Sequence, residues 1–104
     1  MKNLALALTI YVFMSGVLYA ESNKHSVTPN EGFVPDANTA IKIAEAVWLP
    51  IYGERIYGKK PFVASLENDV WVVQGSMPKI MLGGVPVAEI SKKTGEILRV
   101  SHGQ

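Results

Sequence analysis

The sequence predicts an α+β domain in which one N-terminal helix packs on a four-stranded antiparallel sheet. Two observations carry this prediction. Residues 37–49 place apolar side chains at helical spacing, and four later segments are rich in β-forming residues: 62–66, 70–75, 85–91 and 96–102. Polar or glycine-containing turns separate most neighbouring segments, so each strand can fold back on the one before it.

The chain begins with the layout of a secretory signal peptide. Lys2 gives a basic start, the apolar run Leu4–Leu18 follows, and the run closes on the small residue Ala20. This run of about 15 residues is short for a helix that crosses a hydrocarbon core of roughly 30 Å. We therefore expect residues 1–20 to be a signal peptide that is cleaved near Ala20, which places the mature protein in the periplasm. An uncleaved N-terminal membrane anchor is the alternative.

The mature chain is small and balanced in charge. Without its first 20 residues it has 84, enough for one domain. Only one of the ten Lys and Arg residues, Lys2, lies in the leader, so nine cations and nine acids remain and the formal net charge is zero. Nucleic acids and anionic membranes attract clustered positive charge, so we expect no nucleic acid partner. We also expect no stable membrane insertion after the leader is cleaved.

Groups that carry catalysis or bind metals are scarce. The absence of cysteine excludes thiol catalysis, thiolate metal sites and a lipid-anchored lipoprotein, and His25 and His102 are too far apart in sequence for a ligand pair. Glu67 and Asp69 lie in a turn, where charged residues are expected for solvation. The pair Gly83-Gly84 lacks the following Lys-Ser/Thr of a phosphate-binding loop. We therefore expect no enzyme activity, and no catalytic, cofactor-binding or metal-binding residues.

The folded domain is expected to span residues 36–104, after a flexible segment at 21–35. That segment is polar and rich in turn-forming residues. Two adjacent apolar residues within it, Phe33 and Val34, are expected to fold back onto the core. Asp36 immediately precedes the helical pattern, so it is expected to cap the helix.

The helix should present one apolar stripe to the sheet. Pro50 disfavours helical geometry at Leu49, so the helix should end or kink there, with Gly53 and Gly58 as later stops. An aromatic-rich helix could also line a ligand groove, but the apolar spacing fits a buried face better. The stripe comprises Ala37, Ala40, Ile41, Ala44, Val47, Trp48 and Ile51.

The first of the four strands should alternate between two faces of the sheet. In the first strand Phe62, Ala64 and Leu66 share one side, and a short polar turn leads to the second strand. Gly95 is available for positive φ in the turn before the last strand. The longer loop at 76–84 concentrates apolar residues, which recur at binding surfaces as well as in cores.

Several segments together resemble one protein family. They are Gly32-Phe33-Val34-Pro35-Asp36, Ala40-Ile41-Lys42-Ile43-Ala44, Ile51-Tyr52-Gly53, Pro61-Phe62, Val70-Trp71-Val72-Val73-Gln74-Gly75, Gly83-Gly84-Val85, Ile90-Ser91-Lys92 and Thr94-Gly95-Glu96-Ile97-Leu98. This ordered set, over about residues 31–104, resembles the small NTF2-fold immunity proteins of bacterial polymorphic-toxin systems. A full NTF2 cone has three helices around a cavity, whereas this chain predicts one. We therefore expect a reduced NTF2-like or cystatin-like fold and a role for the surface rather than for a deep pocket.

The resemblance implies that the protein binds and neutralises a cognate protein toxin. Together with the leader, it implies a toxin that acts in the periplasm, blocked by steric occlusion. No motif marks the contact residues, so the candidates are residues that combine expected exposure with anchor-type chemistry: Tyr57, Lys59, Lys60, Trp71, Met77, Lys79, Ile80 and Met81.

Two alternatives to the immunity function remain. The strand-turn-strand ending at Ile90–Leu98 also resembles PepSY domains, so the protein could be a PepSY-like or cystatin-like periplasmic module that restrains a peptidase or has a structural role. A small-molecule-binding protein is less favoured, because few polar residues converge on a predicted apolar face.

Overall fold

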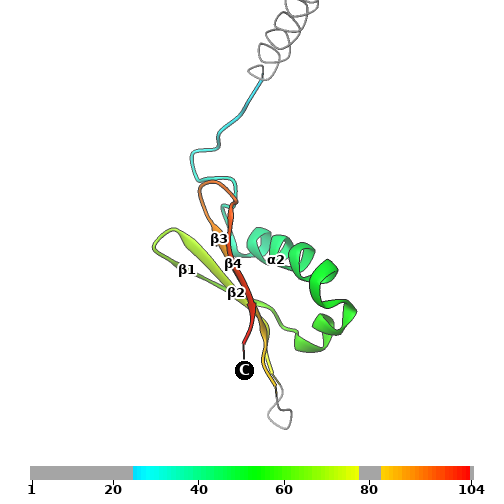
Figure 1. Cartoon of the computed structure of the whole chain (residues 1–104). Helices are drawn as coiled ribbons and strands as arrows, with labels where there is room; N and C mark the ends of the chain where they lie inside the picture. Colours follow the sequence, from blue (N-terminus) through cyan, green and yellow to red (C-terminus); the bar gives the residue numbers. More distant parts are fainter. Residues whose placement is uncertain (1–24, 78–82, 104) are drawn as a thin grey trace, which may run out of the picture.

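A computed structural model describes residues 25–77 and 83–103 of the 104-residue chain (Figure 1). The expected signal peptide at 1–20 lies outside the described residues. The elements follow one another as helix α2 (Ala37–Tyr52), the 3₁₀ helix η1 (Glu54–Lys59) and strands β1 (Val63–Glu67), β2 (Val70–Gln74), β3 (Pro86–Ser91) and β4 (Ile97–His102). One helix on a four-stranded antiparallel sheet is the predicted α+β arrangement. Each strand begins and ends within one residue of the predicted position.

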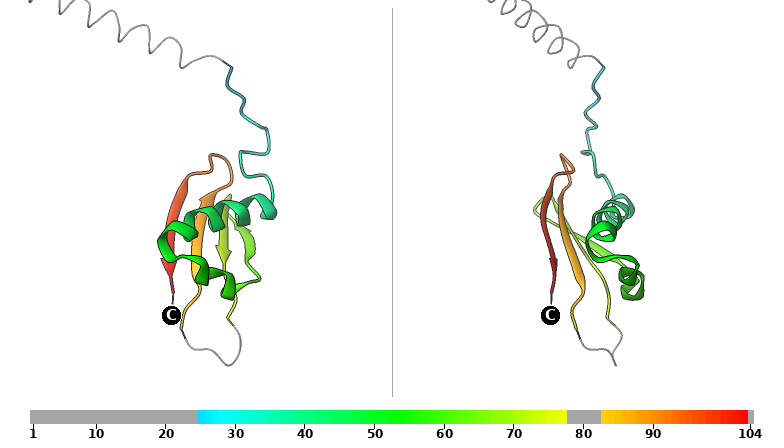
Figure 2. Two further views of the ribbon diagram at one scale, coloured as in Figure 1. Left: turned by 90° about the vertical axis from the view of Figure 1, so that its right-hand side faces the viewer. Right: turned by 45° about the vertical axis from the view of Figure 1, so that its right-hand side comes forward.

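The sheet is a meander in which strands adjacent in sequence pair in the order β1-β2-β3-β4. Helices α2 and η1 both lie over one face of this sheet (Figure 2). Residues paired directly across the strands point to the same face, and the row Ala64, Val73, Ala88 and Val100 runs beneath the helices. The register shifts between Glu89 and Ile90, where β4 contains one extra residue.

The start of α2 is capped as predicted. One carboxylate oxygen of Asp36 accepts hydrogen bonds from the backbone N–H of Thr39, at 2.8 Å, and from its hydroxyl, at 2.7 Å. These two bonds lower the pKa of Asp36 below its ordinary value, because they favour the charged carboxylate.

The end of α2 differs from the prediction at Pro50. The helix passes through Pro50 and ends at Tyr52, and the expected stop Gly53 is its C-cap, with a φ of +80° and an N–H that donates to the Leu49 carbonyl. The continuation into η1 also carries Ile56 back to the core, where it is 1% exposed. The burial of Ile56 gives a physical reason for the additional turn of η1, since burial of one large aliphatic residue stabilises a fold by about 1.5–3 kcal/mol.

The core lies between α2 and the covered face of the sheet. Ala40, Ala44 and Trp48 of the predicted stripe are fully buried, whereas Ile51 is 56% exposed. Ile51 lies on the last turn of the helix, where its neighbour Tyr52 packs against His102 of β4. The Trp48 ring meets the ring of Phe62 edge to face with centroids 5.2 Å apart, and its Nε1–H donates to the Val87 carbonyl at 3.3 Å.

The segment before α2 is attached to the β3–β4 turn. The N–H groups of Phe33 and Val34 donate to the carbonyls of Lys93 and Lys92, at 3.1 and 3.0 Å. Val34 is 1% exposed, as expected for a residue that packs on the core, but Phe33 is 50% exposed. Gly32 permits this close approach, because an added Cβ would lie 2.4 Å from the Lys92 carbonyl oxygen.

Candidate functional site

The 3₁₀ helix η1 and the segment after β2 form the candidate partner surface. The Lys59 carbonyl accepts a hydrogen bond from the Ser76 N–H at 2.6 Å, and the Ser76 hydroxyl donates to the Pro61 carbonyl at 2.7 Å. A Cβ on Gly75 would meet the Lys59 side chain at 3.0 Å, so the absence of a side chain at Gly75 allows the two segments to approach. The structure therefore brings together four of the predicted contact residues, named here the η1 surface: Tyr57, Lys59, Lys60 and Met77.

Tyr57 and Lys60 form the aromatic and cationic part of the η1 surface. The Lys60 ammonium lies 4.9 Å from the centroid of the Tyr57 ring and 5.9 Å from that of Phe62, within the range of cation–π attraction. The Tyr57 ring is 38% exposed, and its hydroxyl donates to a Glu45 carboxylate oxygen at 3.4 Å. Partial desolvation, followed by the negative charge of Glu45, raises the pKa of the Tyr57 hydroxyl. Tyr57 therefore presents a neutral aromatic surface at physiological pH.

The other predicted contact residues differ in their placement. Met77 is 38% exposed at the end of the segment after β2. Lys79, Ile80 and Met81 lie outside the described residues. Trp71 is only 8% exposed, and its Nε1–H donates to the Val34 carbonyl at 2.8 Å. The expected exposure of Trp71 is therefore wrong: this indole joins the sheet to the N-terminal segment and has little surface to offer a partner.

A pocket of about 580 Å³ lies beside the η1 surface, a volume within the usual range of small-molecule sites. We name it the η1 pocket, and eight residues line it: Tyr52, Arg55, Ile56, Gly58, Lys59, Gly83, Gly84 and His102. This pocket is a half-open concavity of the surface between η1, the segment before β3 and the end of β4, so it does not contradict the expectation that the protein acts through its surface rather than through a deep pocket.

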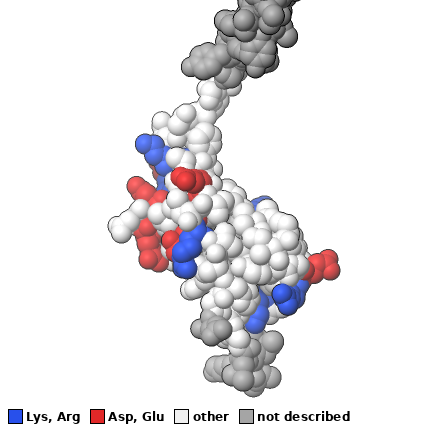
Figure 3. Space-filling model, in the orientation of Figure 1, with Lys and Arg blue, Asp and Glu red and all other residues white. Residues whose placement is uncertain are grey.

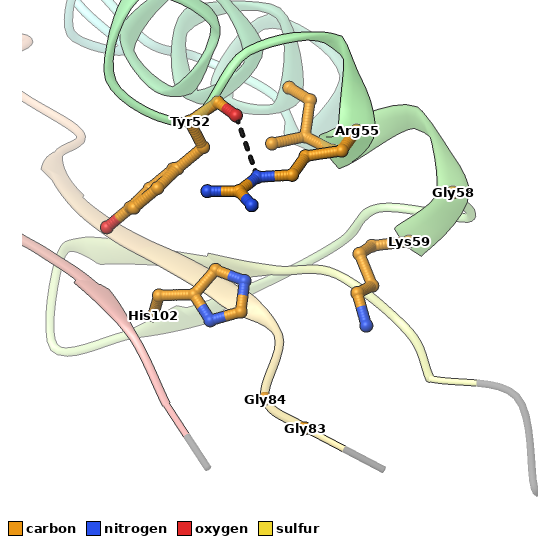
Figure 4. Close-up of a pocket in the computed structure, with 8 residues that line it drawn as sticks. Tyr52, Arg55, Gly58, Lys59, Gly83, Gly84 and His102 are labelled. Atoms are coloured by element: carbon orange, nitrogen blue, oxygen red, sulfur yellow. Dashed lines mark hydrogen bonds between the residues drawn. The ribbon is translucent and has the colours of Figure 1, made fainter. Parts of the chain in front are cut away.

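The basic side chains of the η1 pocket come from two elements, η1 and the end of β4 (Figure 4). The Arg55 Nε–H donates to the Tyr52 carbonyl at 3.0 Å, which holds the guanidinium group over the pocket. The His102 ring packs edge to face against the Tyr52 ring, with centroids 5.2 Å apart. Lys59 extends its amine along the other side, and no carboxylate is among the described residues that line the pocket.

Sequence reasoning missed Arg55 and His102 as site residues. Arg55 and Lys59 are four residues apart, and Tyr52 precedes Arg55 by three, so a shared face was readable from local spacing. His102 and Gly83 reach the pocket only through strand pairing, and no local pattern links them to η1. The space-filling view shows the resulting charge distribution, with Lys and Arg side chains emerging at the lower right, where Figure 1 places η1 (Figure 3).

The described residues offer little support for metal chemistry or membrane spanning. Within 25–77 and 83–103, no three His, Asp or Glu side chains cluster in a way that could hold a metal ion. In the same ranges, no helix combines the length and the hydropathy required to cross a bilayer.

Comparison with known proteins gives one family and one relative. Residues 39–104 match a family model described as NTF2 fold immunity protein. A protein of Escherichia coli strain K12, described as uncharacterized protein YbbC, is 37% identical over 93 residues, which cover 88% of this chain and 74% of that protein. No solved structure matches the chain with significance.

Proposed function

Because this chain belongs to the NTF2 fold immunity protein family, we propose that it is an exported immunity protein that neutralises a cognate periplasm-acting toxin by binding it. The family match is the observation that carries this proposal, since residues 39–104 include nearly all of α2 and the whole sheet. The family supports an immunity function and suggests a role without catalysis.

We propose that inhibition is steric, with the η1 surface as part of the contact. Exposed Tyr57 and Lys60 offer the aromatic and cationic groups that interfaces favour, and Met77 adds an adaptable apolar side chain beside them. A stable one-to-one complex buries about 800 Å² on each partner, so other parts of the surface would have to contribute. Lys79, Ile80 and Met81 follow Met77 in sequence and remain candidates for that contribution.

The charge of the mature chain is consistent with a toxin that acts on the cell wall or membrane. Nine cations and nine acids give a neutral domain. An inhibitor of a nuclease would be expected to carry excess negative charge, in order to match a basic nucleic-acid-binding surface. The leader at residues 1–20 supports export to the compartment in which such a toxin would work.

A protection experiment with the toxin domain encoded next to this gene tests the proposal. The toxin domain is directed to the periplasm of a sensitive strain, and growth is compared between the full chain and a chain that lacks residues 2–20. We expect the full chain to protect and the leaderless chain to fail. Equal protection by both would contradict the need for export.

Direct binding tests the steric mechanism. Purified residues 21–104 should capture the toxin domain at micromolar concentration, and the double variant Tyr57→Ala, Lys60→Ala should bind at least tenfold more weakly. Gln74→Ala, an exposed change in β2, is the matched control and should bind normally. Lack of capture by the unaltered chain, or capture of a neighbouring peptidase instead, would overturn the immunity proposal in favour of a PepSY-like module.

A further inference from the structure

The η1 pocket contains two cationic side chains, Arg55 and Lys59, for which the described residues supply no ion-pair partner. Because its Nε–H is held by the Tyr52 carbonyl, the Arg55 guanidinium is oriented with its terminal amino groups on the pocket side (Figure 4). The two ion pairs found among the described residues involve Lys92 and Arg99, so neither Arg55 nor Lys59 has a carboxylate within 4.0 Å there. Both side chains bring positive charge to the lining of the same pocket, so a bound anion would be attracted to each of them.

The remaining walls of the pocket are apolar or lack side chains. Ile56, which is 1% exposed, is among the lining residues, and the Tyr52 and His102 rings form one side. Gly58 and Gly83 contribute only backbone, and a Cβ added at either position would meet no atom within 4 Å. The space is therefore open for a ligand that has a body as well as a charged group.

We propose that the η1 pocket binds a carboxylate attached to an apolar body, the chemistry of an aromatic acid or of the C-terminal residue of a peptide. The planar guanidinium of Arg55 matches a carboxylate with two parallel hydrogen bonds, and the Lys59 ammonium adds a third donor. The aromatic and aliphatic walls favour the apolar body, which inorganic phosphate does not have. This proposal does not rest on the immunity function.

Titration of the mature chain, residues 21–104, with defined acids tests this site. The probes are N-acetylphenylalanine, acetate and inorganic phosphate at constant ionic strength, followed by two-dimensional amide NMR. N-acetylphenylalanine should shift the amides of Gly83, Gly84 and His102 in a saturable manner, with at least tenfold tighter binding than acetate or phosphate. The absence of saturation at about 10 mM, or equal binding of all three anions, would overturn the proposal.

Variants distinguish the pocket from general attraction to positive charge. Arg55→Gln and Lys59→Gln should each weaken N-acetylphenylalanine binding about tenfold or more, since each removes charged hydrogen-bond donors. Arg55→Lys keeps the charge but loses the planar fork, so its affinity should be intermediate. Lys93→Gln removes an exposed cation near the opposite end and should leave binding unchanged. An equal loss in Lys93→Gln would contradict a built site, and thermal unfolding of each variant verifies that it is folded.

A competition experiment distinguishes whether the toxin or a free acid supplies the carboxylate. If the toxin supplies it, N-acetylphenylalanine should displace the toxin domain, and Arg55→Gln should weaken the complex. If a free acid supplies it, the acid should bind without displacing the toxin, and Arg55→Gln should leave the complex unchanged. Both results support the chemistry of the pocket, whereas failure of the proposed immunity function would appear only in toxin capture.

Discussion

Replacement of Trp48 by alanine should remove a large part of the stability of the domain. Trp48 is fully buried, pairs edge to face with Phe62 and donates a hydrogen bond to the Val87 carbonyl. Truncation of a buried tryptophan to alanine costs about 3–5 kcal/mol. Folded domains have about 0.05–0.15 kcal/mol of stability per residue, or roughly 4–12 kcal/mol for a mature chain of this length. Trp48→Ala should therefore remove at least about a quarter of the free energy of unfolding, and would unfold the domain at 25 °C if the total lies at the lower end of that range.

Urea unfolding at 25 °C, followed by far-ultraviolet circular dichroism, measures this loss. Trp48→Phe keeps an aromatic ring in the core but loses the hydrogen bond of the indole N–H, so it should lower the free energy of unfolding by about 1–2 kcal/mol. This loss can be measured even if Trp48→Ala does not fold. Ile51→Ala is the matched control on the same helix, because Ile51 is 56% exposed, and it should cost about 1 kcal/mol or less. A cost below about 1 kcal/mol for Trp48→Ala, or equal costs for Trp48→Ala and Ile51→Ala, would refute the placement of Trp48 at the centre of the core.

Two further predictions concern the N-terminal attachment and the helix cap. Gly32→Ala should lower the free energy of unfolding, measured in urea, by about 2 kcal/mol or more, because φ of Gly32 is +87° and the new Cβ would collide with the Lys92 carbonyl. The control is Gly103→Ala, where the added Cβ would meet no atom within 4 Å. Equal losses in the two variants would contradict this reasoning. At pH 7, Asp36→Ala should lower the midpoint of thermal unfolding, whereas Asp36→Asn should largely preserve it, since both Asp and Asn cap helices. The folded-state pKa of Asp36 is depressed, so the contribution of its carboxylate is complete above the ordinary value of 3.8 and is lost as the pH falls through the lower folded-state pKa. The stability difference between wild type and Asp36→Ala should therefore shrink in that range, and a difference that grows on acidification would reverse the sign of this linkage.

Most of the local structure was predictable because it depends on nearby residues. The cap at Asp36, the positions of the strands and the turn at Gly95 follow from backbone preferences and side-chain spacing. Pro50 was predicted to end or kink α2 at Leu49, with Gly53 and Gly58 as later stops, since the residue before a proline resists helical geometry. The helix nevertheless continues to Tyr52, and Ile56 is buried beyond it, so packing offset a local preference.

The candidate site was only partly predictable. Tyr57, Lys59, Lys60 and Met77 were selected for their chemistry, and they lie together at one end of the domain. Trp71 had the same anchor-type chemistry and proved to be buried, because alternation along a strand does not by itself say which face is covered.

The sequence by itself determined that this chain has one capped helix, four strands, a neutral mature charge and no thiol chemistry. Those properties depend on residue identity and short-range spacing. Only the tertiary structure decided that Trp71 is buried against Val34, and that His102 and Gly83 border the same pocket as Arg55. The physical reason is that these residues meet through strand pairing and through the packing of η1 on the sheet edge, contacts between segments 19 to 47 residues apart that no local pattern specifies.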